Sequence, residues 1–263
     1  MQLLGKNQYS GTISELNCFP GFTIGLTHYD TLYKNDVFHC HENPHISLLL
    51  EGGHIERRLK KDFQRLPGDV LFCNTGEPHQ FITKRKSKNI NIEFEPQFLS
   101  DQDISEFEVE KSINANFEAK FTILKIFKEL AISDNSTQLS IELSLLDLIT
   151  APTSANDKKR PSWFKCLLEI LHDRWNEHLS LDELSILTQV HPVTISKYSA
   201  KYLECTLGEY KRKLKISKSL GLIKNSKLSL TEIAFICGFS DQSHFIRTFK
   251  NVTGYLPKKF ENL

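Results

Sequence analysis

Apolar residues near the carboxy-terminal end recur with the period of an α-helix. They predict a short amphipathic helix with one buried face: Leu230, Ile233, Ala234 and Ile236. Gly238 stands where a left-handed residue ends a helix, and Ser240 is the expected N-cap of a second helix, with Asp241 in its first turn. Phe245 and Phe249 fall on one face of that second helix. Two short helices joined by a turn that contains glycine are the pattern of a DNA-binding helix-turn-helix.

The same pattern occurs a second time, about fifty residues earlier. Residues 179–188 align with residues 228–237. Both copies begin with a capping box, in which a serine is followed three residues later by a glutamate: Ser180 with Glu183, and Ser229 with Glu232. His191 and Pro192 open the second helix of the first copy, because proline suits the first helical position. A long basic helix over residues 207–223 is expected to join the two copies.

Short β-rich segments separated by turn residues fill most of the first hundred residues. The segments with strand composition are 22–29, 37–41, 46–50, 70–73 and 89–94. Gly52, Gly53 and Pro67 mark turns between them. Many short strands at this spacing predict a sandwich or a barrel. Residues 93–110 carry seven acidic side chains, and we expect a solvated loop there.

Two amphipathic helical segments follow the strands, over residues 116–130 and 138–149. Their apolar stripes must pack against another surface. Two alternatives remain: a second copy of the chain in a homodimer, or the chain's own strands. Residues 151–161 have the composition of an interdomain linker. We therefore expect an α+β chain with a β-rich domain and helical pair over 1–150, and an all-α domain with two helix-turn-helix motifs over 162–263.

Charge divides along the same boundary. Residues 158–263 hold 18 Lys and Arg against 10 Asp and Glu, whereas residues 1–157 hold 15 against 22. A basic half joined to an acidic half fits a polyanion binder tethered to another domain; the alternative is a chance asymmetry between two solvated surfaces. The six cysteines show no paired spacing, and the start of the chain lacks a signal-peptide layout. We therefore expect a cytoplasmic protein with reduced thiols and no membrane partner.

Histidines mark a candidate ligand site in the β-rich half. His39 and His41 alternate along one strand, and His79 follows a Gly-Glu-Pro turn. These segments resemble the paired motifs of the cupin barrel, in which two such histidines, an acidic residue and a third histidine bind a metal. The resemblance puts the acidic ligand near His45 or Ile46, and neither is acidic. We therefore expect an effector pocket with these four histidines and no cofactor; a metal site of the same four is the alternative: His39, His41, His45 and His79.

A set of residues in the basic half matches the motifs of one family. The set includes His191-Pro192-Val193, Thr206-Leu-Gly-Glu-Tyr210, Gly238-Phe-Ser-Asp-Gln-Ser-His-Phe245, Arg247 and Gly254. Together, residues 162–262 resemble the AraC/XylS family of bacterial transcription regulators. The resemblance implies two recognition helices that enter successive major-groove faces of one DNA site, about one turn apart. A cupin-like amino-terminal half with a helical pair is usual in that family, so the resemblance extends over nearly the whole chain.

The resemblance also assigns residues to DNA contact. The first copy would present to DNA Val193, Thr194, Ser196 and Lys197, with Lys201 near phosphate. The second copy would present Gln242, Ser243, His244 and Arg247, with Lys250 near phosphate. Arg247 suits bidentate contact with guanine and Gln242 suits adenine. For each of these residues the alternative is a solvated surface position.

The first copy departs from the family pattern at three positions. Gln189 and Glu204 stand where the pattern has glycine, and Ser199 stands where it has a core phenylalanine. Losing a buried phenylalanine costs roughly 3–5 kcal/mol unless neighbours refill the space, and Tyr198 or Tyr202 is the candidate for that. We expect the first copy to be less rigid than the second, or to bind DNA more weakly.

These observations predict a sequence-specific DNA-binding transcription regulator rather than an enzyme. We expect an activator controlled by an unknown small-molecule effector in the amino-terminal barrel. Its partners would be double-stranded DNA, a second copy in a homodimer and, for an activator, RNA polymerase. One alternative is a metal-dependent cupin enzyme or metal sensor fused to a DNA-binding domain. Another is a sequence-indifferent DNA-packaging protein, against which a net charge of only +1 argues.

Overall fold

The computed structural model describes residues 1–30, 37–59, 61–83, 85–132, 134–150 and 160–263. It is an α+β structure that divides into two compact units, Met1–Thr153 (with Leu263) and Ser154–Asn262. The first unit carries the described strands and four helices, and the second unit is helical. Most of the expected linker over residues 151–161 lies outside the described residues.

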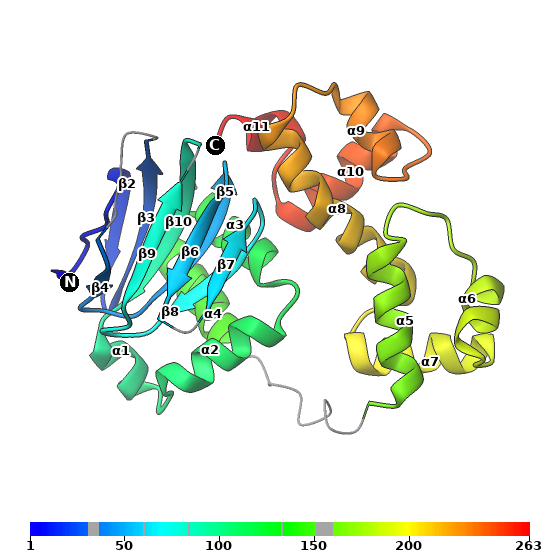
Figure 1. Ribbon diagram of the computed structural model, residues 1–263, viewed down its shortest axis with the longest axis horizontal. Helices are drawn as coiled ribbons and strands as arrows, with labels where there is room; N and C mark the ends of the chain where they lie inside the picture. Colours follow the sequence, from blue (N-terminus) through cyan, green and yellow to red (C-terminus); the bar gives the residue numbers. More distant parts are fainter. Residues whose placement is uncertain (31–36, 60, 84, 133, 151–159) are drawn as a thin grey trace. The chain divides into compact units, whose positions relative to one another are not determined.

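The described strands form two five-stranded sheets (Figure 1). One sheet has the order β1 (Gln2–Leu4), β4 (His39–His41), β9 (His79–Thr83), β6 (His54–Arg58), β7 (Asp62–Arg65). The other has the order β2 (Thr12–Phe19), β3 (Phe22–Tyr29), β10 (Ser87–Phe94), β5 (His45–Glu51), β8 (Val70–Cys73). Pairing is antiparallel except between β1 and β4, which are parallel. The sequence missed β1, β2, β6, β7 and β9 as separate strands.

One face of β10 is polar although it is buried. Asn89 donates to the Ser47 hydroxyl (3.1 Å) and Asn91 to the Thr27 hydroxyl (3.0 Å). Arg65, on the other sheet, donates to the Ser47 backbone oxygen at 2.7 Å. The two sheets therefore face each other across a polar interior in which several buried groups are held by hydrogen bonds, while others, such as Arg65 Nε, have no partner among the described residues.

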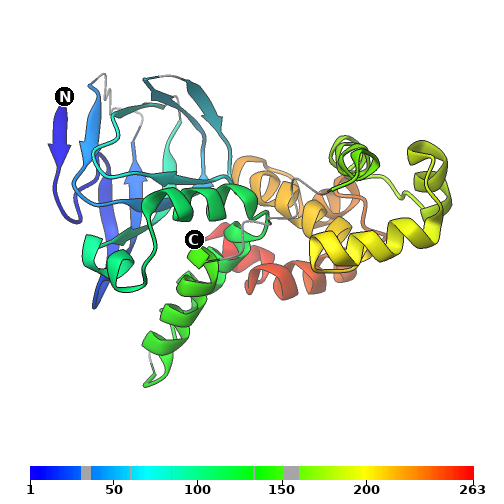
Figure 2. The same ribbon diagram turned by 90° about the horizontal axis from the view of Figure 1, so that it is seen from below.

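The opposite face of β10 is apolar and lies under helices. Phe94 of β10 and Phe22 of β3 both contact Phe98, at centroid distances of 5.9 and 5.4 Å. Phe98 belongs to the first of four helices that lie on one side of the sheets (Figures 1 and 2): α1 (Pro96–Asp101), α2 (Glu106–Ala115), α3 (Ala119–Glu129) and α4 (Thr137–Thr150). Both faces of β10 are buried, which explains its nearly continuous burial pattern.

The prediction of a solvated loop over residues 93–110 is wrong. Glu93 is buried at the end of β10, where it accepts hydrogen bonds from Tyr9 and Asn43. Ser105 and Glu108 form a capping box that starts α2. The other acidic side chains of this segment are exposed or half-buried, and the count of charges alone did not reveal the two helices α1 and α2 that carry most of them.

The second unit contains seven described helices, several of which match the sequence analysis closely. Their bounds are α5 (Ser162–Asp173), α6 (Leu181–Thr188), α7 (Pro192–Leu203), α8 (Leu207–Asn225), α9 (Leu230–Ile236), α10 (Gln242–Thr253) and α11 (Pro257–Glu261). Helix α8 runs from the α6–α7 pair to the α9–α10 pair (Figure 1). Among the described residues, no helix is both long enough and apolar enough to cross a membrane.

Candidate functional site

The second helix pair, α9 and α10, is shaped by the turn between them. Ser229 and Glu232 cap α9 reciprocally, at 3.3 and 2.7 Å. Gly238 follows with φ 70°, and a Cβ there would lie 1.9 Å from the Asn176 carbonyl oxygen. No other residue fits this position, because both the left-handed backbone and the close approach of Asn176 exclude a side chain. The predicted capping box and glycine stop are confirmed.

Helix α10 begins one residue later than the sequence suggested. The predicted N-cap, Ser240, is wrong: the N-cap is Asp241, whose carboxylate accepts from the His244 backbone N–H at 2.7 Å. Phe245 and Phe249 are fully buried, as predicted. An aspartate at the N-cap also favours the positive end of the helix dipole.

The residues assigned to DNA contact on α10 divide into two kinds. Ser243, Arg247 and Lys250 are exposed and follow one another along one stripe of the helix, at the i, i+4, i+7 spacing. Gln242 and His244 are half-buried: the Gln242 side-chain oxygen accepts from the Thr231 hydroxyl at 2.9 Å, and the His244 ring meets a neighbouring phenylalanine edge-on at 5.2 Å.

The first helix pair, α6 and α7, repeats this arrangement. The Ser180–Glu183 capping box starts α6, and His191 caps α7 by accepting from the Val193 backbone N–H at 3.3 Å. The residues assigned to DNA contact on α7 are exposed or half-buried: Val193, Thr194, Ser196, Lys197 and Lys201. Lys201 lies near the rings of Tyr198 and Tyr202, at 5.8 and 5.4 Å.

The three departures of the first copy have visible consequences. Gln189 and Glu204 both adopt the left-handed conformation, with φ 55° and 56°. Ser199 is fully buried, and its hydroxyl has no hydrogen-bond partner among the described residues. Tyr202 packs 5.0 Å from the buried Phe164 of α5, which gives this copy an aromatic core of a different composition.

Helix α8 is tied to both helix pairs by two lysines, Lys211 and Lys215. Lys211 Nζ donates to the Leu179 carbonyl at 2.5 Å, directly before α6. Lys215 Nζ donates to the Gly238 carbonyl at 2.6 Å, in the turn before α10. Burial lowers the pKa of both lysines. A signal was present in the sequence, because these lysines share an i+4 row of α8 with the buried Leu207.

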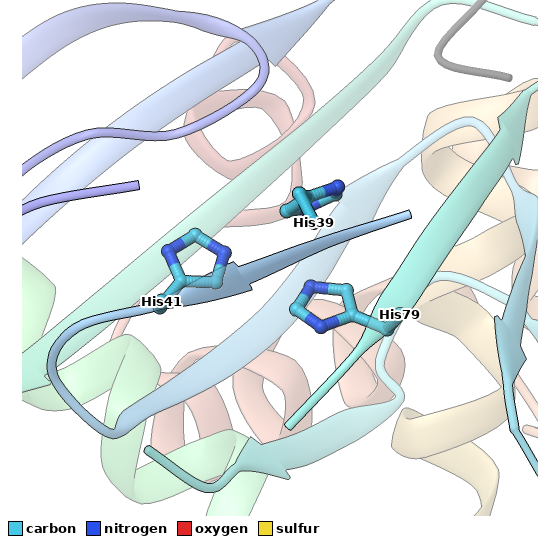
Figure 3. Close-up of side chains that lie close together, drawn as sticks. All are labelled: His39, His41 and His79. Atoms are coloured by element: carbon cyan, nitrogen blue, oxygen red, sulfur yellow. The ribbon is translucent and has the colours of Figure 1, made fainter. Parts of the chain in front are cut away.

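Four histidines predicted as a site come together in the polar interior of the first unit. His39 and His41 lie on β4, His79 on β9 and His45 on β5, and all are at most 3% exposed. Ring centroids are 4.4 Å apart for His39 and His79, 5.3 Å for His41 and His79, and 4.5 Å for His41 and His45. One ligand nitrogen from each of His39, His41 and His79 lies within 4.8 Å of the others (Figure 3).

Burial keeps these histidines neutral near pH 7. Burial, together with the neighbouring His79, lowers the pKa of His39 to about 4 and that of His41 to about 3. The pKa of His45 is well below its usual value, and that of His79 is lowered, for the same reason. Neutral imidazoles are hydrogen-bonding groups and metal ligands rather than charge carriers.

Comparison with known proteins links the helical unit to DNA binding. A family model described as a helix-turn-helix domain matches residues 184–262. The transcriptional activator RhaR of Mannheimia succiniciproducens is 23% identical over 256 residues, covering 91% of this chain and 91% of its own. The transcriptional regulator GbdR of Pseudomonas aeruginosa is 27% identical over 92 residues, which are 35% of this chain and 25% of that relative.

Among solved structures, ToxT of Vibrio cholerae aligns over 92% of this chain and 98% of its own, with 11% identity and a TM-score of 0.38. The family model and the sequence relatives bear on the function, since they match the segment in which the two capped helix pairs lie. With two capped helix pairs joined by α8 and a helix-turn-helix family match over residues 184–262, the chain is a DNA-binding transcriptional regulator.

Proposed function

We propose that α7 and α10 are the two recognition helices of this regulator and that they read successive major-groove faces of one DNA site. The base-facing residues are Val193, Thr194, Ser196 and Lys197 on α7, and Gln242, Ser243, His244 and Arg247 on α10. Lys201 and Lys250 lie against phosphates, where they add affinity without sequence information.

One observation supports this most strongly. When α7 is aligned with α10 at an offset of fifty residues, most positions share the same degree of burial, and the exceptions are Ser196 with Ile246, Tyr198 with Thr248 and Leu203 with Thr253. Lys197 and Arg247 are both exposed cations at the same point of the two helices, and Ile195 and Phe245 beneath them are both fully buried. A duplicated unit that keeps one solvent-facing stripe polar and cationic has the residue types that read bases and phosphates.

The half-buried members of the set have a positioning role as well. Gln242 accepts from the Thr231 hydroxyl of α9, so its amide N–H₂ group stays available to donate to a base. His244 is braced against Phe239, which restricts its ring to one orientation. Bracing of this kind lowers the entropy that the side chain loses when it docks in the groove.

For the first unit we infer a cupin-like barrel that binds the effector between its two sheets, close to His39, His41, His45 and His79. Support comes from the polar interior, in which four neutral imidazoles lie close together. A regulator of this design works only if the effector prefers one arrangement of the chain over another.

The proposed homodimer uses α4. Leu139 and Leu143 lie one turn apart on this helix and are 60% and 58% exposed. Two exposed leucines on one face suit a seam with a second copy. Sedimentation checks this: the doubly substituted Leu139→Arg, Leu143→Arg variant should be monomeric, and a variant that sediments like the wild type argues against the seam.

Because a full-length relative is named as an activator, we also infer activation, which in vitro transcription with RNA polymerase tests.

Competition binding tests the DNA-reading proposal. A site selected from random duplexes is competed with scrambled DNA at fixed salt, and Arg247→Ala should reduce specific affinity by about 1–3 kcal/mol while leaving the non-specific affinity nearly unchanged. The matched control is Lys218→Ala, which removes an exposed cation from α8. If Arg247→Ala discriminates as well as the wild type, this residue is not a base reader.

A further inference from the structure

The rings of His39, His41 and His79 converge on one point from two paired strands. His39 and His79 are register partners on β4 and β9, and His41 lies two residues further along β4 on the same face. Each side chain is at most 3% exposed. Figure 3 shows the three rings gathered over these strands. One ligand nitrogen from each ring lies within 4.8 Å of the other two.

In each ring, one nitrogen is hydrogen-bonded to a backbone group, and the other has no hydrogen-bond partner in the described part of the chain. His79 Nδ1 donates to the Glu77 carbonyl at 3.0 Å, while its Nε2 has no partner among the described residues. His39 is hydrogen-bonded to the Val37 backbone, which leaves Nε2 bare, and His41 to the Gln8 backbone, which leaves Nδ1 bare. A neutral ring that donates to a carbonyl through one nitrogen carries a lone pair on the other.

This pattern leaves three buried lone pairs close together with no donor among the described residues. Buried polar atoms are nearly always satisfied, so three unsatisfied acceptors in one place need an explanation. A cation satisfies all three at once. Metal-ligating histidines also share this outer arrangement, in which the second ring nitrogen donates to a backbone carbonyl and fixes the ring and its tautomer.

We propose that His39, His41 and His79 bind one divalent first-row transition-metal ion. Three imidazoles suit zinc, cobalt, nickel, copper or iron rather than magnesium or calcium, which prefer oxygen ligands. Three protein ligands leave a further coordination position for water or a small molecule. The buried carboxylate of Glu56 is ion-paired with Arg58 and Arg65, so it does not take that position.

This inference does not rest on the DNA-reading proposal, because metal binding is measured without DNA. The test uses the full chain, freed of metal with a chelator and titrated with Co²⁺, whose visible absorption bands report nitrogen coordination. The wild type should bind one equivalent and should unfold at higher temperature when the ion is present. His39→Gln and His79→Gln should each weaken binding roughly 100-fold or more, since loss of a ligand exceeds the 10–100-fold loss typical of an outer-shell change.

The matched control is His28→Gln, at a partly exposed histidine on β3 that bonds to the Ser14 hydroxyl at 2.8 Å. It should bind Co²⁺ like the wild type. Circular dichroism of each metal-free variant separates loss of ligand from loss of fold. The inference is overturned if the folded wild type shows no cobalt bands and no thermal shift, or if folded His39→Gln and His79→Gln variants bind as tightly as the wild type.

Discussion

At the scale of single residues, the first helix-turn-helix carries strain that the second avoids. Gln189 and Glu204 hold left-handed backbone that costs a residue with a side chain about 1 kcal/mol each. In the second copy the corresponding turn positions are Gly238 and Gly254, at φ 70° and 82°. The buried hydroxyl of Ser199 adds a further unsatisfied group. We therefore expect the first copy to have the lower local stability.

Buried histidines make the first unit sensitive to acid. Burial lowers the pKa of His39 to about 4, that of His41 to about 3 and that of His54 to about 3, whereas in the unfolded chain such groups titrate at about 6.5. Between these values the unfolded chain binds protons that the folded chain does not. The free energy of unfolding should therefore fall as the pH drops from about 6.5 towards about 4.

Urea titrations at pH values between about 7 and about 4 check this. Both tryptophans, Trp163 and Trp175, lie in the second unit, so their fluorescence reports that unit and far-UV circular dichroism reports both. The dichroism transition of the first unit should move to lower urea in acid, and His54→Gln should lessen the movement. A midpoint that stays constant over this range contradicts the assignment of neutral buried histidines.

The sequence predicted the roles of several residues correctly and missed others. The capping serines were predicted because a serine three residues before a glutamate has a local geometric meaning. The choice of Ser240 over Asp241 as N-cap failed, since both types cap helices and only the backbone geometry decides. The backbone partner of the His41 ring could not be predicted, because Gln8 and His41 are distant in sequence.

At the scale of elements, α8 is more than a spacer. Lys211 and Lys215 tie it to carbonyls in front of α6 and in the turn before α10. Because these bonds join elements that are far apart in the sequence, they restrict rotation of each helix pair about α8. The orientation of the two recognition helices thus depends on two lysine side chains that face inward.

The variant Lys215→Met tests this role. It keeps the apolar length of the side chain but removes the donor to the half-buried Gly238 carbonyl, and we expect the second unit to lose about 1–2 kcal/mol of unfolding free energy. Tryptophan fluorescence in urea measures this loss. Lys218→Met, at an exposed position of the same helix, should change stability by no more than about 0.5 kcal/mol. Equal stability of the two variants would show that the bond to Gly238 is unimportant.

Helices were easier to predict than strands for a physical reason. Helices α9 and α10 carry their caps and apolar faces within a few residues, so a local pattern suffices. Strand β9 is held by β4 and β6, which lie far from it along the chain, and buried positions of β6 and β9 are polar: His54, Glu56 and Gln80. Alternation of apolar and polar residues, the usual strand signal, is absent where both faces of the interior are polar.

At the scale of the whole molecule, helix α8 sets the spacing between the two proposed recognition helices. The 19 residues of α8 span about 28 Å at 1.5 Å per residue, close to the roughly 34 Å of one turn of B-DNA. Two recognition helices fixed to such a spacer suit one face of a duplex, with contacts about one turn apart. The two recognition helices should therefore protect two DNA segments on the same face of the duplex. Damage to one helix should remove protection of its own segment only.

Hydroxyl-radical footprinting of the full chain on a site selected from random duplexes tests this most directly. The account predicts two protected patches on one face of the duplex, about 10 base pairs apart, with Lys197→Ala weakening one patch and Arg247→Ala weakening the other. A single patch, or the loss of the same patch in both variants, would contradict it.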